Sequence, residues 1–348
     1  MNRARIHGIM AFGAVTALAL LAAGCGSSPG HGANANNSQG AAPPASLNVE
    51  LDWVPNPDHV GLYYAQNKGY FTKQNLTVHF QIPSNTADPI KLVGLNKVDL
   101  AISYEPEMFY GQQEKLPVVA VAAVIPVPLN GLIVSPKISL QNVCQIKGHS
   151  VGVTGIPSDG AIYTTMLAKC HLTPKQVPKV TVGFNLVPSV LAGRVDAIVG
   201  GYRNVEDIQI SQEMNKKATD FPADQLGVPN YDELVLVANK NRLASDKAYA
   251  SAVKRFVAAF VAGTSAAMKS PGGSTNIMLT ASQYKPSFLQ VSVPYTLKLI
   301  AQNNGMKAGC MSLSSWQSFG NWMKSNTLIT DTPSASAVMT DKYLPYSC

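Results

Sequence analysis

Two segments of the sequence, residues 95–104 and 192–202, follow the same pattern. They read LNKVDLAISY and AGRVDAIVGGY, so each combines a helix end, a basic residue, Val-Asp, a short apolar strand and a tyrosine. About 100 residues separate the copies, too many for a solenoid, whose repeat is about 20–50 residues. Two similar α/β units predict two lobes facing one cleft, because ligands bind beyond the carboxyl ends of strands in open α/β sheets. The alternative is that βαβ units resemble one another in many folds.

The first 25 residues have the pattern of an export signal. Arg3 and Arg5 precede an apolar run from Ile9 to Leu21, which is shorter than the roughly 20 residues that cross a membrane. The run ends in LAAGC, which resembles a bacterial lipobox. This resemblance implies that Cys25 is diacylated and becomes the mature N-terminus. An ordinary secretory signal with a chance cysteine is the alternative.

Residues 26–46 contain only Gly, Ser, Pro, His, Ala, Asn and Gln. Such a segment buries too little apolar surface to offset chain entropy, so we expect a flexible tether. Two acyl chains give stable anchoring, whereas one chain gives marginal binding. We therefore expect an extracytoplasmic body anchored by lipid to the cell membrane.

Composition and charge exclude some function classes. The formal net charge is +7, but charged residues make up only 14% of the chain and no run of Lys or Arg stands out. Nucleic-acid binding therefore has no support. The sequence also has no G-x-S-x-G elbow and no phosphate-cradling Walker loop, so its candidate residues suit binding a ligand better than transforming it. We expect no enzyme activity and no cofactor.

Four cysteines follow Cys25, and none lies in a CxxC motif or a Cys/His cluster, so we expect no metal site. An even number of cysteines outside the cytoplasm favours disulfides. Three pairings are possible for Cys144, Cys170, Cys310 and Cys348. We prefer Cys144–Cys170 and Cys310–Cys348, because each pair stays within one inferred lobe.

The apolar patterns predict a β-α-β-α-β order that occurs twice, which is typical of parallel sheets. Strands are expected at 47–53, 76–80 and 98–102, and the pattern restarts after residue 135 with strands at 151–153, 180–182 and 195–199. The simplest organisation has lobe one at 47–134 plus 239–348 and lobe two at 135–238. Crossing strands near 131–135 and 234–238 are then hinges for closure around a ligand.

Three aromatic residues, Trp53, Tyr104 and Tyr202, each end an expected strand. Rings around a cleft can stack a flat ligand, at about 1–3 kcal/mol per ring by analogy with nucleic-acid bases. The alternative is that each ring packs in a core.

Polar candidates lie near these rings in the sequence. Glu105 and Glu107 flank a proline at the start of an expected helix, where a carboxylate either caps the helix or accepts N–H groups from an aminopyrimidine edge. Four short polar residues in loops, which could instead cap turns, are Asn56, His59, Asn185 and Asn204. Asp99 and Asp196, at the start of the two repeated strands, are interpreted as structural.

Several motifs together resemble the binding proteins for thiamine-pyrimidine precursors. They are LDWVPNPDHVGLY (residues 51–63), VGFNLVPSVL (182–191), RVDA (194–197), GGYRNVE (200–206) and DELVLV (232–237), and the similarity spans roughly 47–345. The resemblance implies a type II periplasmic-binding-protein fold, an ABC importer permease as partner, a monomer, and hydroxymethylpyrimidine or a formylaminomethyl-pyrimidine as ligand. By that match, Trp53, Tyr104 and Tyr202 stack the pyrimidine. The residues implied to bind its polar edge are Asn56, His59, Glu105, Glu107, Asn185 and Asn204.

The chain departs from that family in places. Pro57-Asp58 stands where relatives often have Thr-Asn, Val60 where they have Thr, and Arg203 where they have Trp. A riboflavin-binding branch shares much of the signature, so a flavin is an alternative ligand, as is a sulfonate or nitrate. Fungal pyrimidine-precursor synthases also resemble the family, but they carry a cysteine cluster that this sequence lacks. A sensory or adhesion subunit with the same fold is a third class.

Overall fold

The structure of the protein is a computed structural model that describes residues 42–84, 89–183, 185–303 and 305–348. Cys25, the export signal and most of the expected tether lie outside these residues. Within them, the strands form two five-stranded sheets. Among the described residues, no helix combines the length and the apolar character needed to cross a membrane.

The first sheet has the strand order β2-β1-β3-β10-β4. Its strands are β1 (Ala45–Glu50), β2 (Leu76–Gln81), β3 (Leu100–Ser103), β4 (Val118–Ile125) and β10 (Leu234–Asn239). β1 pairs in parallel with β2 and β3, whereas β10 runs antiparallel to both β3 and β4. The alternating pattern at the start of β1 fits a half-buried strand, and every residue of β4 is buried, as its continuous apolar sequence indicates.

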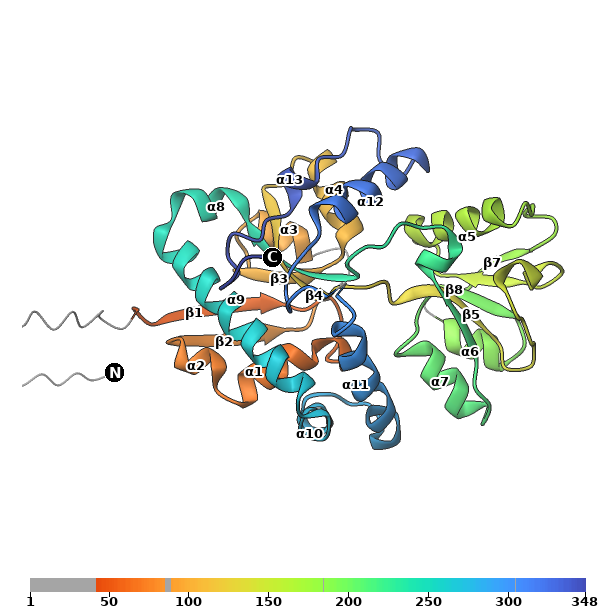
Figure 1. The fold of residues 1–348 in the computed structure, drawn as a ribbon, viewed down its shortest axis with the longest axis horizontal. Coiled ribbons are helices and arrows are strands. Elements are labelled where there is room, and N and C mark those ends of the chain that lie inside the picture. Colours follow the sequence, from red (N-terminus) through yellow and green to blue (C-terminus); the bar gives the residue numbers. More distant parts are fainter. Residues whose placement is uncertain (1–41, 85–88, 184, 304) are drawn as a thin grey trace, which may run out of the picture. The chain divides into compact units, whose positions relative to one another are not determined.

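The second sheet repeats this arrangement with the order β7-β6-β8-β5-β9. Its strands are β5 (Asn130–Val134), β6 (Val151–Val153), β7 (Lys179–Thr181), β8 (Ala197–Tyr202) and β9 (Thr219–Pro222). β6 is parallel to β7 and β8, while β5 is antiparallel to β8 and β9. In each sheet, a strand that enters from the other half lies fourth in the order, and the two repeated segments supply the equivalent strands β3 and β8 (Figure 1).

Two strands differ from the expected lobe boundaries. β5 belongs to the second sheet, although the boundary at 134 assigned it to lobe one, and β10 belongs to the first sheet, although the boundary at 238 assigned it to lobe two. Each strand follows a crossing and pairs within the sheet that it enters. Ala45 and Ser46 lie in β1 rather than in the tether, since both pair with β2. Local pattern shows that these segments are strands, but it does not show which strands they pair with.

The described chain has sixteen helical segments, of which the first ten lie between strands and the last six follow β10. They are η1 (Pro57–His59), α1 (Val60–Asn67), α2 (Tyr70–Lys73), α3 (Pro89–Gly94), α4 (Glu105–Gln113), η2 (Val143–Ile146), α5 (Pro157–Lys169), α6 (Leu186–Leu191), α7 (Glu206–Glu213), η3 (Ala223–Leu226), α8 (Lys240–Ser245), α9 (Lys247–Met268), α10 (Pro271–Ala281), α11 (Pro286–Ile300), α12 (Leu313–Ser325) and α13 (Ala335–Val338). Proline occupies the first turn of α4, α5, α10 and α11, where its missing N–H costs nothing.

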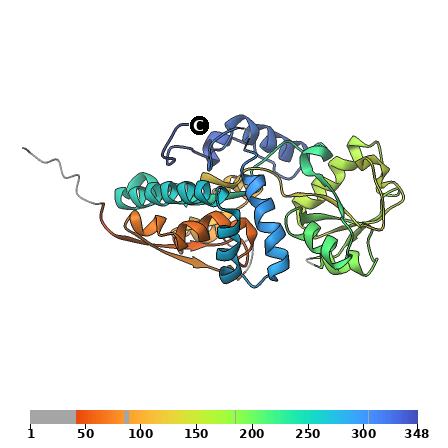
Figure 2. The same cartoon turned by 60° about the horizontal axis from the view of Figure 1, so that its bottom comes forward.

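The helices after β10 return to the first half, where α9 packs on α1 and α2, and α12 packs on α4. α11 packs on α10 of the first half and also contacts α7 of the second half (Figure 2). α11 is therefore one of the elements that join the two halves.

The structure contains both expected disulfides. Cys144 pairs with Cys170, with a Cα–Cα distance of 5.1 Å, and Cys310 pairs with Cys348 at 5.7 Å. These distances lie within the range that a disulfide requires. The first crosslink lies within the second half, and the second joins the segment before α12 to the C-terminal segment.

Candidate ligand-binding site

The tyrosines of the two repeated segments come together. Tyr104 follows β3, and its hydroxyl donates to Oδ2 of Asp52 at 3.0 Å. Tyr202 ends β8, and burial raises its pKa well above 10, with further contributions from Glu233, Tyr104 and Asp52. Both rings also pack against the core of the first half. Tyr104 and Tyr202 therefore lie in one half-buried region, although they come from different sheets.

Asp52 and His59 form a buried pair next to Tyr104. His59 is fully buried, and its Nε2 lies 2.7 Å from Oδ1 of Asp52. The backbone N–H of Asn56 points at Nδ1 of His59 at 3.3 Å, so Nδ1 accepts and the proton belongs on Nε2, which donates to Asp52. Oδ1 of Asn56 accepts from the N–H of Asp58 at 2.7 Å. In this structure Asn56 and His59 therefore hold the loop that carries Asp52 and Asp58.

Asn204 connects the second half to the first. Its Nδ2 donates to Oδ1 of Asp58 at 2.5 Å and to Oγ1 of Thr296 on α11 at 2.8 Å. Ser292 on the same helix donates to the carbonyl of Asn204. Burial raises the pKa of Asp58 to about 7. Oδ2 of Asp58 and Oδ1 of Asn204 are both buried and have no hydrogen-bond partner among the described residues.

Three more carboxylates lie where the chain re-enters the first sheet. Glu105 is fully buried, and its Oε2 accepts from the N–H of Asp232 at 2.7 Å. Burial and the charge of Asp232 raise the pKa of Glu105 well above 4.5. Oε2 of Glu233 accepts from the N–H groups of Leu129 and Asn130, at 2.8 and 3.1 Å. Glu233, on one crossing of the chain, thus binds the backbone of the other crossing.

We call the five buried carboxylates of this region the acidic cluster. It consists of Asp52, Asp58, Glu105, Asp232 and Glu233. Apart from His59, the main charges that affect the pKa values of Asp58, Glu105, Tyr104 and Tyr202 in the described chain are acidic. Such a region suits a ligand rich in N–H donors and disfavours an oxyanion.

The structure does not bring all nine candidates into this region. Asn185 is exposed at the start of α6. Glu107 is half-buried, and the charges that affect its pKa are those of Glu114 and Lys91, which do not belong to the acidic cluster; burial, the largest cause, raises that pKa. Trp53 is 41% exposed and directly follows Asp52, which places it at the edge of the cluster. The ligand roles of all nine residues stay predictions.

Sequence reasoning missed several residues of the region. Asp52, Asp58 and Glu233 are all buried, yet each stood inside a quoted motif without being chosen. Tyr231, whose hydroxyl donates to Glu233 at 2.9 Å, was also missed. The available signal was the density of acids beside aromatic residues in these motifs. Among the described residues, no group of three His, Cys, Asp or Glu has an arrangement that could hold a metal ion.

Comparisons with known proteins agree with this architecture. The alkanesulfonate-binding protein SsuA from Xanthomonas axonopodis pv. citri superimposes with a TM-score of 0.61 at 15% identity, over 86% of this chain and 100% of that chain. At that identity the likeness shows the fold alone, and it confirms the expected type II periplasmic-binding-protein fold, with two α/β lobes.

Relatives in sequence are of two kinds. A protein of Haemophilus influenzae named for thiamine biosynthesis is 39% identical over 243 residues, covering 70% of this chain and 74% of that protein. The formylaminopyrimidine-binding protein of Halalkalibacterium halodurans is 33% identical over 288 residues, covering 80% and 84%. A 4-amino-5-hydroxymethyl-2-methylpyrimidine phosphate synthase of Saccharomyces cerevisiae is 26% identical over 186 residues, which is 53% of each chain. The profile described as NMT1/THI5 like matches residues 56–274. The chain belongs to the NMT1/THI5-like family.

Proposed function

We propose that the protein is the extracytoplasmic substrate-binding lipoprotein of an ABC importer and that it binds a thiamine pyrimidine precursor. The observation that carries this proposal is the meeting of Tyr104, Tyr202 and the acidic cluster in one region built by both sheets. The rings offer flat faces for an aromatic ligand, and the carboxylates offer acceptors for its amino groups.

The similarity to a formylaminopyrimidine-binding protein supports the same ligand class. The acidic cluster opposes the sulfonate and nitrate alternatives, because burial and neighbouring acids already raise the pKa values of Asp58 and Glu105, so further negative charge is disfavoured there. The synthase relative is more distant and spans about half of each chain, so we favour a binding protein over an enzyme. The lipobox at residues 21–25 supports the lipid anchor and hence the partnership with a membrane permease.

A ligand screen by thermal unfolding tests the proposal. Formylaminomethyl-pyrimidine, hydroxymethylpyrimidine, riboflavin, an alkanesulfonate and nitrate are added separately to the purified protein. A ligand at 100 times its dissociation constant stabilises the native state by about 2.7 kcal/mol. We expect a clear rise in Tm with a pyrimidine and none with the anions. A rise with the sulfonate alone contradicts the proposal, and a rise with riboflavin alone moves the protein to the flavin branch.

Trp53→Ala sharpens this screen, because Trp53 is 41% exposed and we expect both halves to fold without it. We expect the variant to unfold at the wild-type Tm without ligand and to lose most of the shift produced by the pyrimidine. Leu95→Ala is the matched control, since Leu95 is 66% exposed and lies outside the region. Equal ligand shifts in wild type and Trp53→Ala would remove Trp53 from the site.

A further inference from the structure

A cavity of about 670 Å³ lies between α7 and β9 on one side and α11 on the other. Its volume is in the range of small-molecule sites. The wall from the second half includes Arg203, Asp207 and Asp220, and α11 contributes Val291, Pro294, Tyr295 and Lys298. None of the nine candidates above and no member of the acidic cluster lines it. The cavity is therefore separate from the proposed pyrimidine site.

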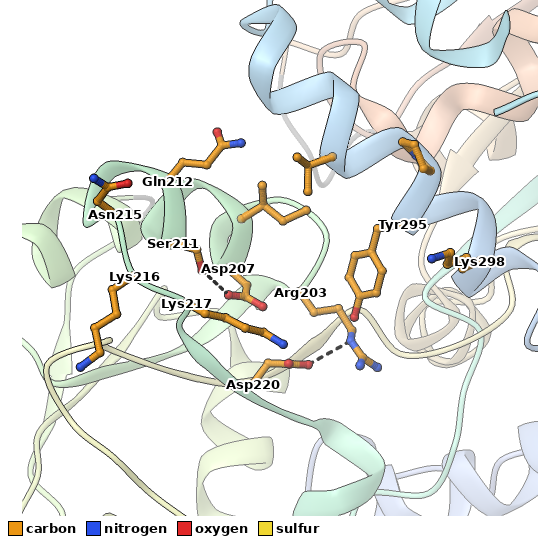
Figure 3. Close-up of a pocket in the computed structure, with 13 residues that line it drawn as sticks. Arg203, Asp207, Ser211, Gln212, Asn215, Lys216, Lys217, Asp220, Tyr295 and Lys298 are labelled. Atoms are coloured by element: carbon orange, nitrogen blue, oxygen red, sulfur yellow. Dashed lines mark hydrogen bonds and ion pairs between the residues drawn. The ribbon is translucent and has the colours of Figure 1, made fainter. Parts of the chain in front are cut away.

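Arg203 lines this cavity and has two partners there. Its Nε lies 3.1 Å from Oδ2 of Asp220, and the carbon of its guanidinium lies 5.9 Å from the centre of the Tyr295 ring. Figure 3 shows Tyr295 facing Arg203 from α11, with the carboxylate of Asp220 beside the guanidinium. Arg203, which stands where related sequences often have Trp, therefore forms part of this cavity.

The charges around the cavity favour an anion. Asp207 accepts from Ser211 at 3.0 Å. Burial and then Asp220 raise the pKa of Asp207 to about 6, while the charges of Lys217 and Arg203 lower it. Figure 3 shows the side chain of Lys217 extending toward Asp207, Asp220 and Arg203. Arg203 is thus paired with Asp220, whereas no carboxylate of the described residues lies within ion-pair distance of Lys217.

Two more cations, Lys216 and Lys298, line the same cavity, and both are exposed. Within the described residues, no carboxylate lies within ion-pair distance of either. The cavity therefore has more basic than acidic side chains in its lining, whereas the acidic cluster consists of carboxyl groups. Since Arg203 and Tyr295 present flat faces beside apolar groups of Val291 and Pro294, the lining also suits an aromatic ring.

We propose that this cavity is a second ligand site, which binds a small flat organic anion with its ring against Tyr295 and its oxyanion toward Lys217. The site goes beyond the proposed pyrimidine binding and does not depend on it. Because both halves line the cavity, a ligand there contacts α7 and α11 together.

Calorimetric titration of the full chain with 2-naphthoate, at low ionic strength and neutral pH, tests the site. We expect naphthoate to bind and its uncharged isostere 2-naphthylmethanol to bind about tenfold more weakly, since one charge-assisted contact is lost. Lys217→Gln should weaken naphthoate about tenfold, and Tyr295→Leu should weaken both probes through the lost ring. Lys254→Gln, on the exposed face of α9, is the charge-matched control and should leave both affinities unchanged.

Trp53→Ala distinguishes this cavity from the first site, because Trp53 lies beside the acidic cluster. We expect it to leave naphthoate affinity unchanged. Absence of naphthoate binding overturns the proposal. So does binding that Trp53→Ala weakens and Lys217→Gln does not, since the anion would then occupy the first site. Each variant is first checked for a wild-type circular dichroism spectrum, and Tyr295→Leu replaces Lys217→Gln if the latter fails to fold.

Discussion

The two repeated segments are alike up to the tyrosine and differ after it. Asp99 accepts from the N–H of Asn48 at 2.9 Å, and Asp196 accepts from the N–H of Ser150 at 2.9 Å. Each aspartate thus bonds the backbone of a distant residue, which lies in the neighbouring parallel strand or leads into it. Both residues were interpreted as structural, but the bonds expected were to local backbone N–H groups. The common part of the pattern builds the scaffold.

The residues after the tyrosines have different environments. Glu105 lies in the buried region and bonds the backbone of Asp232, whereas Arg203 lines the cavity between α7 and α11, beside Asp220. Asn204 then returns to the first region to bond Asp58. The repeated strand therefore determines where the chain leaves each sheet. The residues after the tyrosine determine the chemistry of the buried region and of the cavity.

The largest expected effect is on ligand affinity. Tyr202→Ala should weaken the pyrimidine ligand roughly 10- to 100-fold, because a stacked ring contributes about 1–3 kcal/mol. Tyr202→Phe keeps the ring and should retain most of the affinity. Isothermal titration of both variants measures this. If Tyr202→Ala binds the ligand as tightly as wild type while Tyr104→Ala does not, the two tyrosines are not equivalent. The two repeated segments would then not contribute alike to the site.

An intermediate effect concerns the shared aspartates. Asp99→Ala should lower the free energy of unfolding by about 2 kcal/mol, because it removes the acceptor for Asn48 and the partner of Arg242 at 2.8 Å. Asp196 is more exposed, so Asp196→Ala should cost about 1 kcal/mol. Urea unfolding of the two variants gives both values. Changes in ligand affinity without loss of stability would show that these carboxylates have a binding role instead.

The last effect is a change in the pH dependence of stability where Asn204 meets Asp58. Burial raises the pKa of Asp58 to about 7 in the folded protein from an ordinary value of 3.8. Between those values the folded state keeps a proton that the unfolded state has released, so stability falls as pH rises, by at most about 1.4 kcal/mol per pH unit for one group. Asp58→Asn cannot titrate and should show a shallower slope between pH 4.5 and 7 in urea unfolding.

Wild type and Asp58→Asn should both retain some of this slope, because burial also raises the pKa of Glu206 and of Asp232 to about 7. The difference between the two slopes therefore isolates Asp58. Parallel slopes would mean that Asp58 is charged in the folded protein at neutral pH.

Sequence reasoning predicted the two α/β halves because apolar periodicity is local, and it predicted both disulfides because each pair spans one half. It missed the pairing of β5 and β10 and the existence of β9, since pairing partners lie far along the chain. At the site it located the rings of Tyr104 and Tyr202 from strand ends. Asp52 and Asp58 escaped because a carboxylate in a Pro- and Asn-rich loop has the pattern of a solvated turn, and their burial arises only when Tyr104 and Asn204 pack over them.

The position of β10 has a consequence for how the molecule assembles. As the chain emerges during synthesis, all five strands of the second sheet, from residue 130 to residue 222, appear before β10 does. That sheet can pair completely while β3 and β4 still wait for the strand that separates them. Unpaired strand edges favour aggregation, and closing such a distant contact is slow. The first sheet therefore begins to form first but is completed last. Until β10 pairs, the open edges of β3 and β4 are where newly made molecules are most prone to aggregate.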